Sequence, residues 1–251
     1  NDRYVVEVPT VTEALKKSES IHAKDAKFLR SKTEKLTKFT LPGPMTISDT
    51  IANEFYADKA EMAMEFAKLL NDEAKTLCNE GIDIIQFDEP AFNSFLEESI
   101  EWGMDAMEVA IDGLECKTAI HICYGYGIEE NLNWKKTLGD QWRQYENLFP
   151  AINQSNIDQV SLEFAGSRVP PELMRLLPDK EIMAGVISVV GDHIETAEEV
   201  EKNIISALDH VEAERLIPCT NCGMAPISVD VAKQKLQALG EGTKRAAKRI
   251  S

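Results

Sequence analysis

Short apolar runs alternate with longer segments of helical periodicity along most of this chain. Six runs are interpreted as strands, at roughly 39–47, 82–88, 117–124, 159–165, 182–190 and 215–221. A weaker run at 4–8 is a doubtful seventh. Strands that alternate with helices form parallel sheets, because each parallel pair needs a long crossover connection. With 251 residues, the pattern predicts a (β/α)8 barrel or a doubly wound open sheet.

The intervening segments carry signals for the starts of helices. Residues 50–79 have apolar side chains at helical spacing, with Ser48 and Asp49 as candidate caps. Thr196-Ala-Glu-Glu199 is a capping box that predicts a helix start. Ser228 is a candidate cap for a last helix with a basic end.

Chemically reactive side chains follow several of the predicted strands. Asp88, His121 with Cys123, Glu163 and Cys222 each stand at the C-terminal end of an apolar run. A barrel builds one site from the ends of many strands, whereas an open sheet concentrates its site at one switch point. We therefore predict a barrel, with residues 1–251 as one catalytic domain.

Four of these side chains have the chemistry of a metal site. His121 and Cys123 are two residues apart on a strand and so face the same side. Thiolate, imidazole and carboxylate are ligands that zinc prefers, and a carboxylate such as Glu163 at the end of an apolar strand is costly unless it is paired. Either thiol of Cys219-x-x-Cys222 could complete the set. The competing interpretation of the His-x-Cys pair is core packing.

Composition excludes several other classes of protein. A net charge of −16 disfavours a nucleic-acid-binding surface, and no apolar run approaches the length of a membrane span. Five cysteines without a paired spacing predict no disulfide framework and indicate a cytoplasmic protein. Cys78 and Cys116 are expected to be small buried hydrophobic residues.

Six ordered segments resemble the catalytic domain of the cobalamin-independent methionine synthase family. The segments are Leu41-Pro-Gly-Pro-Met-Thr-Ile47, Ile84-Ile-Gln-Phe-Asp-Glu-Pro-Ala91, His121-Ile-Cys123-Tyr124, Ser161-Leu-Glu163, Ala184-Gly-Val186 and Asn221-Cys222-Gly223. The resemblance spans about residues 25–240. It implies a zinc-dependent methyltransferase of methionine biosynthesis, which moves a methyl group from 5-methyltetrahydrofolate to the thiol of homocysteine.

The resemblance also implies roles for single residues. His121, Cys123, Glu163 and Cys222 would hold Zn²⁺, with Cys222 preferred over Cys219. Asp88 would bind the ammonium group of homocysteine. Glu89 is assigned to the same substrate site, although it could instead brace a neighbouring strand.

Two departures from the family pattern stand out. The family usually has Tyr-Asp-Ile-His after the Gly185 strand, where this chain continues from Ile187 to His193 with Ser-Val-Val-Gly-Asp between them. His193, three residues beyond the family histidine, is the candidate for proton transfer. Relative to the family barrel, the chain also begins after the first one or two βα units, so we expect an N-terminally incomplete barrel.

Alternatives remain for the substrates. The same zinc and thiol chemistry would serve a methyl-corrinoid protein as donor, or another thiol of the coenzyme M type as acceptor. A non-catalytic protein that retains the barrel is a rival of another class, and the complete ligand set argues against it.

Overall fold

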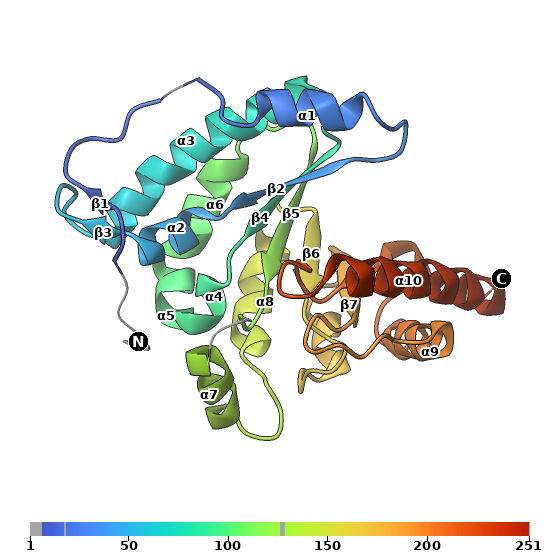
Figure 1. Ribbon diagram of the computed structural model, residues 1–251. Coiled ribbons are helices and arrows are strands. Elements are labelled where there is room, and N and C mark those ends of the chain that lie inside the picture. Colours follow the sequence, from blue (N-terminus) through green and yellow to red (C-terminus); the bar gives the residue numbers. More distant parts are fainter. Residues whose placement is uncertain (1–6, 18, 126–128, 251) are drawn as a thin grey trace. The chain divides into compact units, whose positions relative to one another are not determined.

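A computed structural model describes residues 7–17, 19–125 and 129–250 (Figure 1). The backbone divides into two compact units, of which one comprises Asn1–Ile122 with Gln154–Gln159 and the other Cys123–Asn153 with Val160–Ser251. The described strands are β1 (Thr10–Val11), β2 (Lys38–Pro42), β3 (Ala52–Asn53), β4 (Ile84–Asp88), β5 (Lys117–Ile122), β6 (Gln159–Leu162), β7 (Glu181–Ile187) and β8 (Leu216–Thr220).

Helices separate most of these strands. The α-helices are α1 (Ala23–Arg30), α2 (Pro44–Thr50), α3 (Lys59–Asn79), α4 (Ala91–Ser94), α5 (Leu96–Glu98), α6 (Met104–Ile111), α7 (Glu129–Thr137), α8 (Tyr145–Gln154), α9 (Ala197–Leu208) and α10 (Val229–Ile250). A π-helical turn (Ser99–Gly103) and two 3₁₀ turns (Pro171–Leu176 and Ala213–Arg215) complete the description.

In the first unit, β2, β4 and β5 pair in parallel. Their register places Pro42 opposite Asp88 and Asp88 opposite His121, so three strands end at the same level. The strand side chains Ile85, Phe87 and Ile120 are buried, and α3 packs against α6 (Figure 1). The polar residues predicted at strand ends thus stand on one edge of a packed sheet.

In the second unit, β7 and β8 pair in parallel, and α9 lies beside α10 (Figure 1). Helix α9 begins as predicted, because the Thr196 side chain accepts the Glu199 N–H while the Glu199 carboxylate accepts the Thr196 N–H. The predicted cap of the last helix is also present, since Ser228 Oγ accepts the Val231 N–H at 3.3 Å.

The six strands predicted from apolar runs all exist, and the α/β class with a parallel sheet is confirmed. Within the described residues, the order of hydrogen-bonded strands is β2-β4-β5-β6-β7-β8, an open succession where a complete barrel has eight closed strands. The doubtful strand at 4–8 lies mostly outside the described residues, and residues 7 and 8 are not in a strand.

The predicted start of the helix at 50–79 was wrong. Helix α2 ends at Thr50, and α3 begins only at Lys59, where the Asp58 side chain accepts the Glu61 N–H at 2.9 Å. Between them, Asn53 Oδ1 accepts the Tyr56 N–H at 2.9 Å. This local turn competes with helix formation, as asparagine side chains commonly do.

The expectation for Cys78 and Cys116 was also wrong, because the two residues form a disulfide. Cys78 lies in the last turn of α3, and Cys116 directly precedes β5. A separation of 38 residues hides this proximity in the sequence. Only the packing of α3 against the sheet brings the two ends together.

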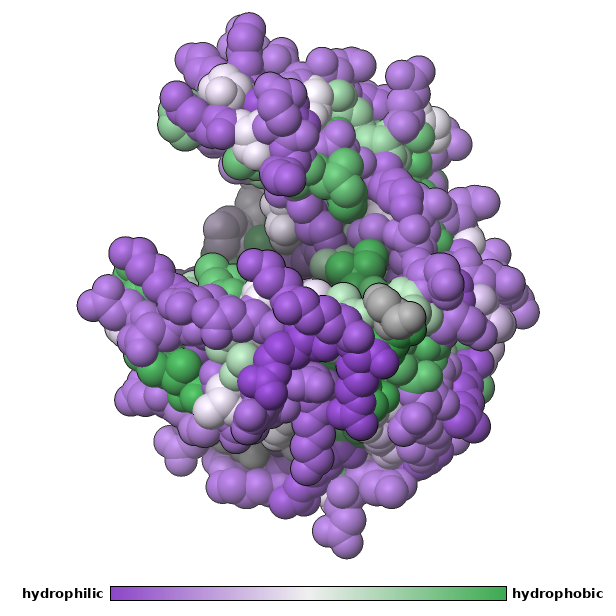
Figure 2. Space-filling view, turned by 90° about the vertical axis from the view of Figure 1, so that its right-hand side faces the viewer, coloured by the Kyte–Doolittle hydropathy of each residue, from purple (hydrophilic) through white to green (hydrophobic). Residues whose placement is uncertain are grey.

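Figure 2 shows a face that is mainly hydrophilic, with hydrophobic residues in separate patches. This agrees with the large excess of acidic residues over basic ones. Among the described residues, no helix is long and apolar enough to cross a membrane.

Candidate metal and substrate site

His121 and Cys123 come from the C-terminal end of β5. His121 is the penultimate residue of the strand, and Cys123 follows its last residue. Both side chains are buried. Residues two apart on extended backbone face the same side, so this short stretch presents an imidazole and a thiol together.

Cys222 comes from the segment after β8, and Asn221 fixes that segment. Asn221 is buried, its N–H donates to Ile187 O at 2.9 Å, and its Oδ1 accepts the Phe164 N–H at 2.8 Å. Asn221 Nδ2 also donates to Ala165 O. The backbone and side chain of Asn221 therefore join the C-terminal ends of β6, β7 and β8.

Gly185 makes this junction possible. A Cβ atom on Gly185 would overlap with Asn221 Oδ1 and would lie 2.7 Å from both Asn221 Cα and Leu162 O. Any larger residue at position 185 would displace Asn221, which directly precedes Cys222.

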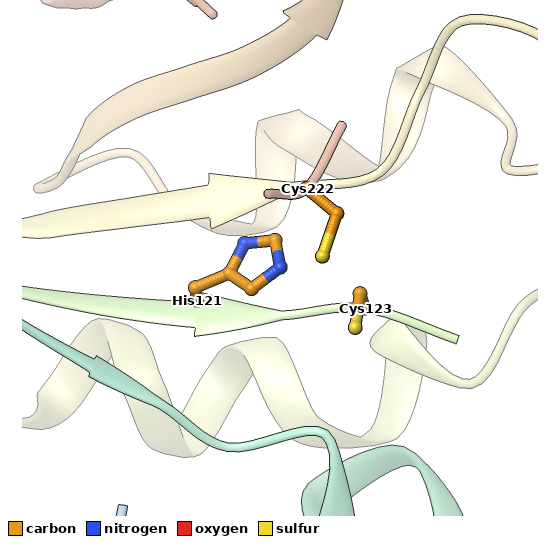
Figure 3. A group of neighbouring side chains, drawn as sticks. All are labelled: His121, Cys123 and Cys222. Atoms are coloured by element: carbon orange, nitrogen blue, oxygen red, sulfur yellow. The ribbon is translucent and has the colours of Figure 1, made fainter. Parts of the chain in front are cut away.

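Figure 3 shows the side chains of His121, Cys123 and Cys222 as neighbours, with the Cys222 sulfur beside the His121 ring. One imidazole nitrogen and the two sulfur atoms all lie within 4.8 Å of each other. Cys222, rather than Cys219, is the second thiol in this group. The spacing and the donor types fit a metal ion that takes nitrogen and sulfur ligands.

The thiols of Cys123 and Cys222 are hydrogen-bonded to one another. Hydrogen bonding with the Cys222 thiol, together with burial, raises the pKa of Cys123 well above its ordinary value. Two neighbouring thiols, of which Cys123 is buried, do not both ionise readily, whereas a bound cation stabilises thiolates. The pair thus has the chemistry of a metal-binding dithiol.

Glu163 directly follows β6, and its carboxylate contacts residues outside the group of His121, Cys123 and Cys222. Its side chain is 3% exposed, and it is absent from the three-residue group. Its Oε2 accepts the Tyr124 N–H at 3.1 Å, and its Oε1 lies 3.5 Å from Lys135 Nζ. The Glu163 carboxylate therefore bonds the residue that follows Cys123. It is held there by the Tyr124 amide and the Lys135 ammonium group.

Aromatic rings surround this carboxylate. The ring of Tyr124 lies 5.0 Å from that of Trp142 and 5.2 Å from that of Tyr145. Burial raises the pKa of both tyrosines, so they stay neutral at the pH values of ordinary chemistry. These rings exclude water from the Glu163 carboxylate and strengthen its electrostatic interactions.

Asp88 ends β4, Glu89 follows it, and the two side chains have different surroundings. Asp88 is partly exposed, and its Oδ1 accepts a hydrogen bond from Gln86 Nε2 at 2.9 Å. Glu89 is fully buried and accepts the N–H groups of Met45 and Thr46, each at 2.9 Å. These bonds hold Glu89 against the first turn of helix α2, where the sequence had raised a neighbouring strand.

Burial is the largest influence on Glu89 and raises its pKa to about 7. Hydrogen bonds from Thr46 and Met45 act in the opposite direction. Gly43 permits this arrangement, because a Cβ at that position would overlap with the Glu89 carboxyl group. The space that Gly43 leaves is therefore filled by a buried carboxyl group.

His193, the predicted proton-transfer residue, is 68% exposed. Its Nε2 lies 3.4 Å from Glu199 Oε1, in the first turn of α9. The structure does not bring His193 into the group formed by His121, Cys123 and Cys222.

Parallel strands with crossover helices, and a cluster of two thiols and an imidazole at the strand ends, define an α/β protein with a candidate metal centre. A family model described as "Cobalamin-independent synthase, Catalytic domain" matches residues 2–245. The chain belongs to this family.

Curated relatives carry the name methionine synthase. The protein of Saccharolobus islandicus is 35% identical over 209 residues, which are 82% of this chain and 57% of that protein. That of Sulfurisphaera tokodaii is 34% identical over 214 residues, covering 85% and 57%. The chain thus spans a little over half the length of these relatives.

Solved structures agree with the family. A B12-independent methionine synthase from Shewanella sp. W3-18-1, in complex with selenomethionine, matches with a TM-score of 0.96 and 52% identity over 99% of this chain and 73% of that one. This likeness confirms the predicted fold class. A putative vitamin-B12 independent methionine synthase from Listeria monocytogenes shares the fold, with a TM-score of 0.71 and 21% identity over 96% and 73% of the two chains.

The sequence analysis did not predict the roles of two residues of the site, Lys135 and Asn221. Lys135 lies on α7, where a lysine signals only a solvated face, and Asn221 was noted only as a neighbour of Cys222. A buried role for Lys135 has no local signature, because it depends on Glu163, 28 residues away. Asn221 had one usable signal, a polar residue directly after an apolar strand.

Proposed function

We propose that this chain is the zinc-binding catalytic part of a methionine synthase. It would transfer a methyl group from 5-methyltetrahydrofolate to the thiol of homocysteine. The observation that carries the proposal is the convergence of His121, Cys123 and Cys222 at the strand ends. Membership of the cobalamin-independent synthase family and the likeness to a methionine synthase complex support it.

Zinc, when bound, would lower the pKa of a substrate thiol so that a thiolate is available near neutral pH. His121, Cys123 and Cys222 would hold the metal, with Glu163 as the fourth candidate ligand. The sulfur–carbon bond forms as the nitrogen–carbon bond of the donor breaks. The thiol proton is released, and the donor nitrogen takes up a proton.

Asp88 is the proposed partner of the substrate ammonium group. It stands in register with His121 on the neighbouring strand, so a small amino acid could reach both. Glu89 holds the α2 turn beside this strand end through Met45 and Thr46.

Calorimetric titration of homocysteine into the zinc-loaded chain tests the proposal. We expect binding that Asp88→Asn weakens at least about tenfold, since a charged hydrogen bond contributes about 1.5–3 kcal/mol. Methionine, which has no free thiol, should bind more weakly than homocysteine. Equal binding of homocysteine with and without zinc would contradict the proposal.

His193 remains the predicted proton-transfer residue. We expect His193→Asn to leave zinc and homocysteine binding unchanged while it slows methyl transfer. Single-turnover assays with methylated folate would measure this. An unchanged rate would remove His193 from the mechanism and leave the metal site intact.

A further inference from the structure

Lys135 is a lysine whose ammonium group is buried. It lies on α7, its side chain is 8% exposed, and its Nζ is 3.5 Å from Glu163 Oε1. The same Nζ lies 5.2 Å from the centre of the Trp142 ring. A carboxylate and an aromatic face therefore hold this cation away from water.

The pair differs from the other lysine contacts of α7. Lys136, the next residue, is exposed and donates to Asn133 Oδ1 at 2.9 Å. Burying a lysine is costly unless a charge partner compensates for it. Lys135 is thus committed to the Glu163 carboxylate in a way that its neighbour is not.

The Glu163 carboxylate has two possible sets of partners, which are Lys135 with Tyr124 on one side and a bound metal ion on the other. In the structure, its two oxygen atoms face Lys135 Nζ and the Tyr124 N–H. Tyr124 directly follows Cys123, so the bond to its N–H places the Glu163 carboxylate beside the backbone that carries the Cys123 thiol. With three ligands from His121, Cys123 and Cys222, a tetrahedral metal has one position left.

We propose that Lys135 is a positioning residue that competes with the metal for the Glu163 carboxylate, so that Glu163, as fourth ligand, gives up its position to the substrate thiol. The inference rests on the proposed function. Without Lys135, Glu163 would be a buried carboxylate without its cation, and the metal would be its best available partner. Lys135 would therefore set the balance between metal affinity and thiol affinity.

Cobalt(II) binding measures this balance directly, because its absorption spectrum reports the number and type of ligands. We expect Lys135→Met to raise cobalt affinity, and to lower homocysteine affinity of the cobalt-loaded chain, each by about tenfold or more. Lys135→Arg keeps the positive charge and should stay close to the parent. Lys136→Met is the matched control and should change neither affinity.

A double-mutant cycle separates positioning from a general structural effect. In a Glu163→Gln background, Lys135→Met should no longer change cobalt affinity, because its effect acts through the carboxylate. The same change in both backgrounds, or no change in either, would overturn the proposal. If the parent binds no cobalt or zinc, the proposed function fails together with this inference, whereas normal binding by the parent isolates the role of Lys135.

Discussion

At the scale of single residues, close approach governs the geometry of the site. Asn221 joins three strand ends, and Gly185 leaves the space that Asn221 needs. Glu89 fills the space beside Gly43 in the same way. In both places the functional geometry depends on a residue without a side chain.

Gly185→Ala should destabilise the protein by about 1–3 kcal/mol, the usual cost of overpacking. It should also weaken metal binding, because Asn221 precedes Cys222. Thermal unfolding and zinc competition would measure both effects. Gly240→Ala is the control, since no atom lies within 4 Å of the added Cβ in helix α10 and alanine favours helix. Equal melting temperatures for Gly185→Ala and the parent would contradict the packing argument.

The raised pKa of Glu89, about 7, makes a prediction about pH. The folded state holds a proton on Glu89 that the unfolded chain loses near its ordinary pKa of 4.5. The contribution of Glu89 is therefore fully present below about pH 4.5 and is lost as pH rises to about 7. At 1.36 kcal/mol for each pKa unit, the loss amounts to about 3 kcal/mol.

Urea unfolding between pH 5 and 7, compared for the parent and Glu89→Gln, would measure this contribution. Glutamine does not titrate, so the variant should lack the part of the pH slope that Glu89 causes. Identical slopes in the two proteins would show that Glu89 does not titrate in this range.

At the scale of elements, a buried ion pair anchors the loop after β7 to the last helix. Lys235 of α10 is fully buried, and its Nζ lies 2.7 Å from Glu195 Oε2. Glu195 Oε1 accepts the Ser188 N–H at 2.8 Å. The loop that carries His193 is thus tied at both of its ends.

Lys235→Met should lower the free energy of unfolding by about 3–5 kcal/mol, because it leaves the Glu195 carboxylate buried without its cation. Chemical denaturation would show the loss. Lys248→Met removes an exposed lysine from the same helix and should change stability by less than about 0.5 kcal/mol. Similar effects of the two substitutions would mean that the buried pair contributes little.

The strands were predictable from the sequence, because fully buried parallel strands appear as continuous apolar runs. The capping box of α9 was predictable because all its atoms lie within four residues. The start of α3 was not, because the Asn53 turn competes with a helical pattern that continues through it. Local signals therefore predicted elements better than their boundaries.

At the scale of the whole molecule, the long-range pairings escaped prediction. The Cys78–Cys116 disulfide and the Lys135–Glu163 pair each join residues that only the fold brings together. His121, Cys123 and Cys222 were predictable because the chemistry of the residues and the family resemblance pointed to the same positions. The resemblance, not the spacing, favoured Cys222 over Cys219, and the structure places Cys222 in the group.

The disulfide predicts a thiol count. Three of the five cysteines, Cys123, Cys219 and Cys222, are not part of a disulfide. Titration with a thiol reagent, in denaturant with a chelator, should find three thiols before reduction and five afterwards. Five thiols before reduction would show that Cys78 and Cys116 are not bonded in the isolated protein.

The most direct test of the central claim is the zinc content of the purified chain, compared with Cys222→Ser and Cys219→Ser. We predict one zinc per chain in the parent and in Cys219→Ser, and a loss of at least about tenfold in affinity in Cys222→Ser. Zinc binding that survives Cys222→Ser but fails in Cys219→Ser, or no zinc binding by the parent, would contradict it.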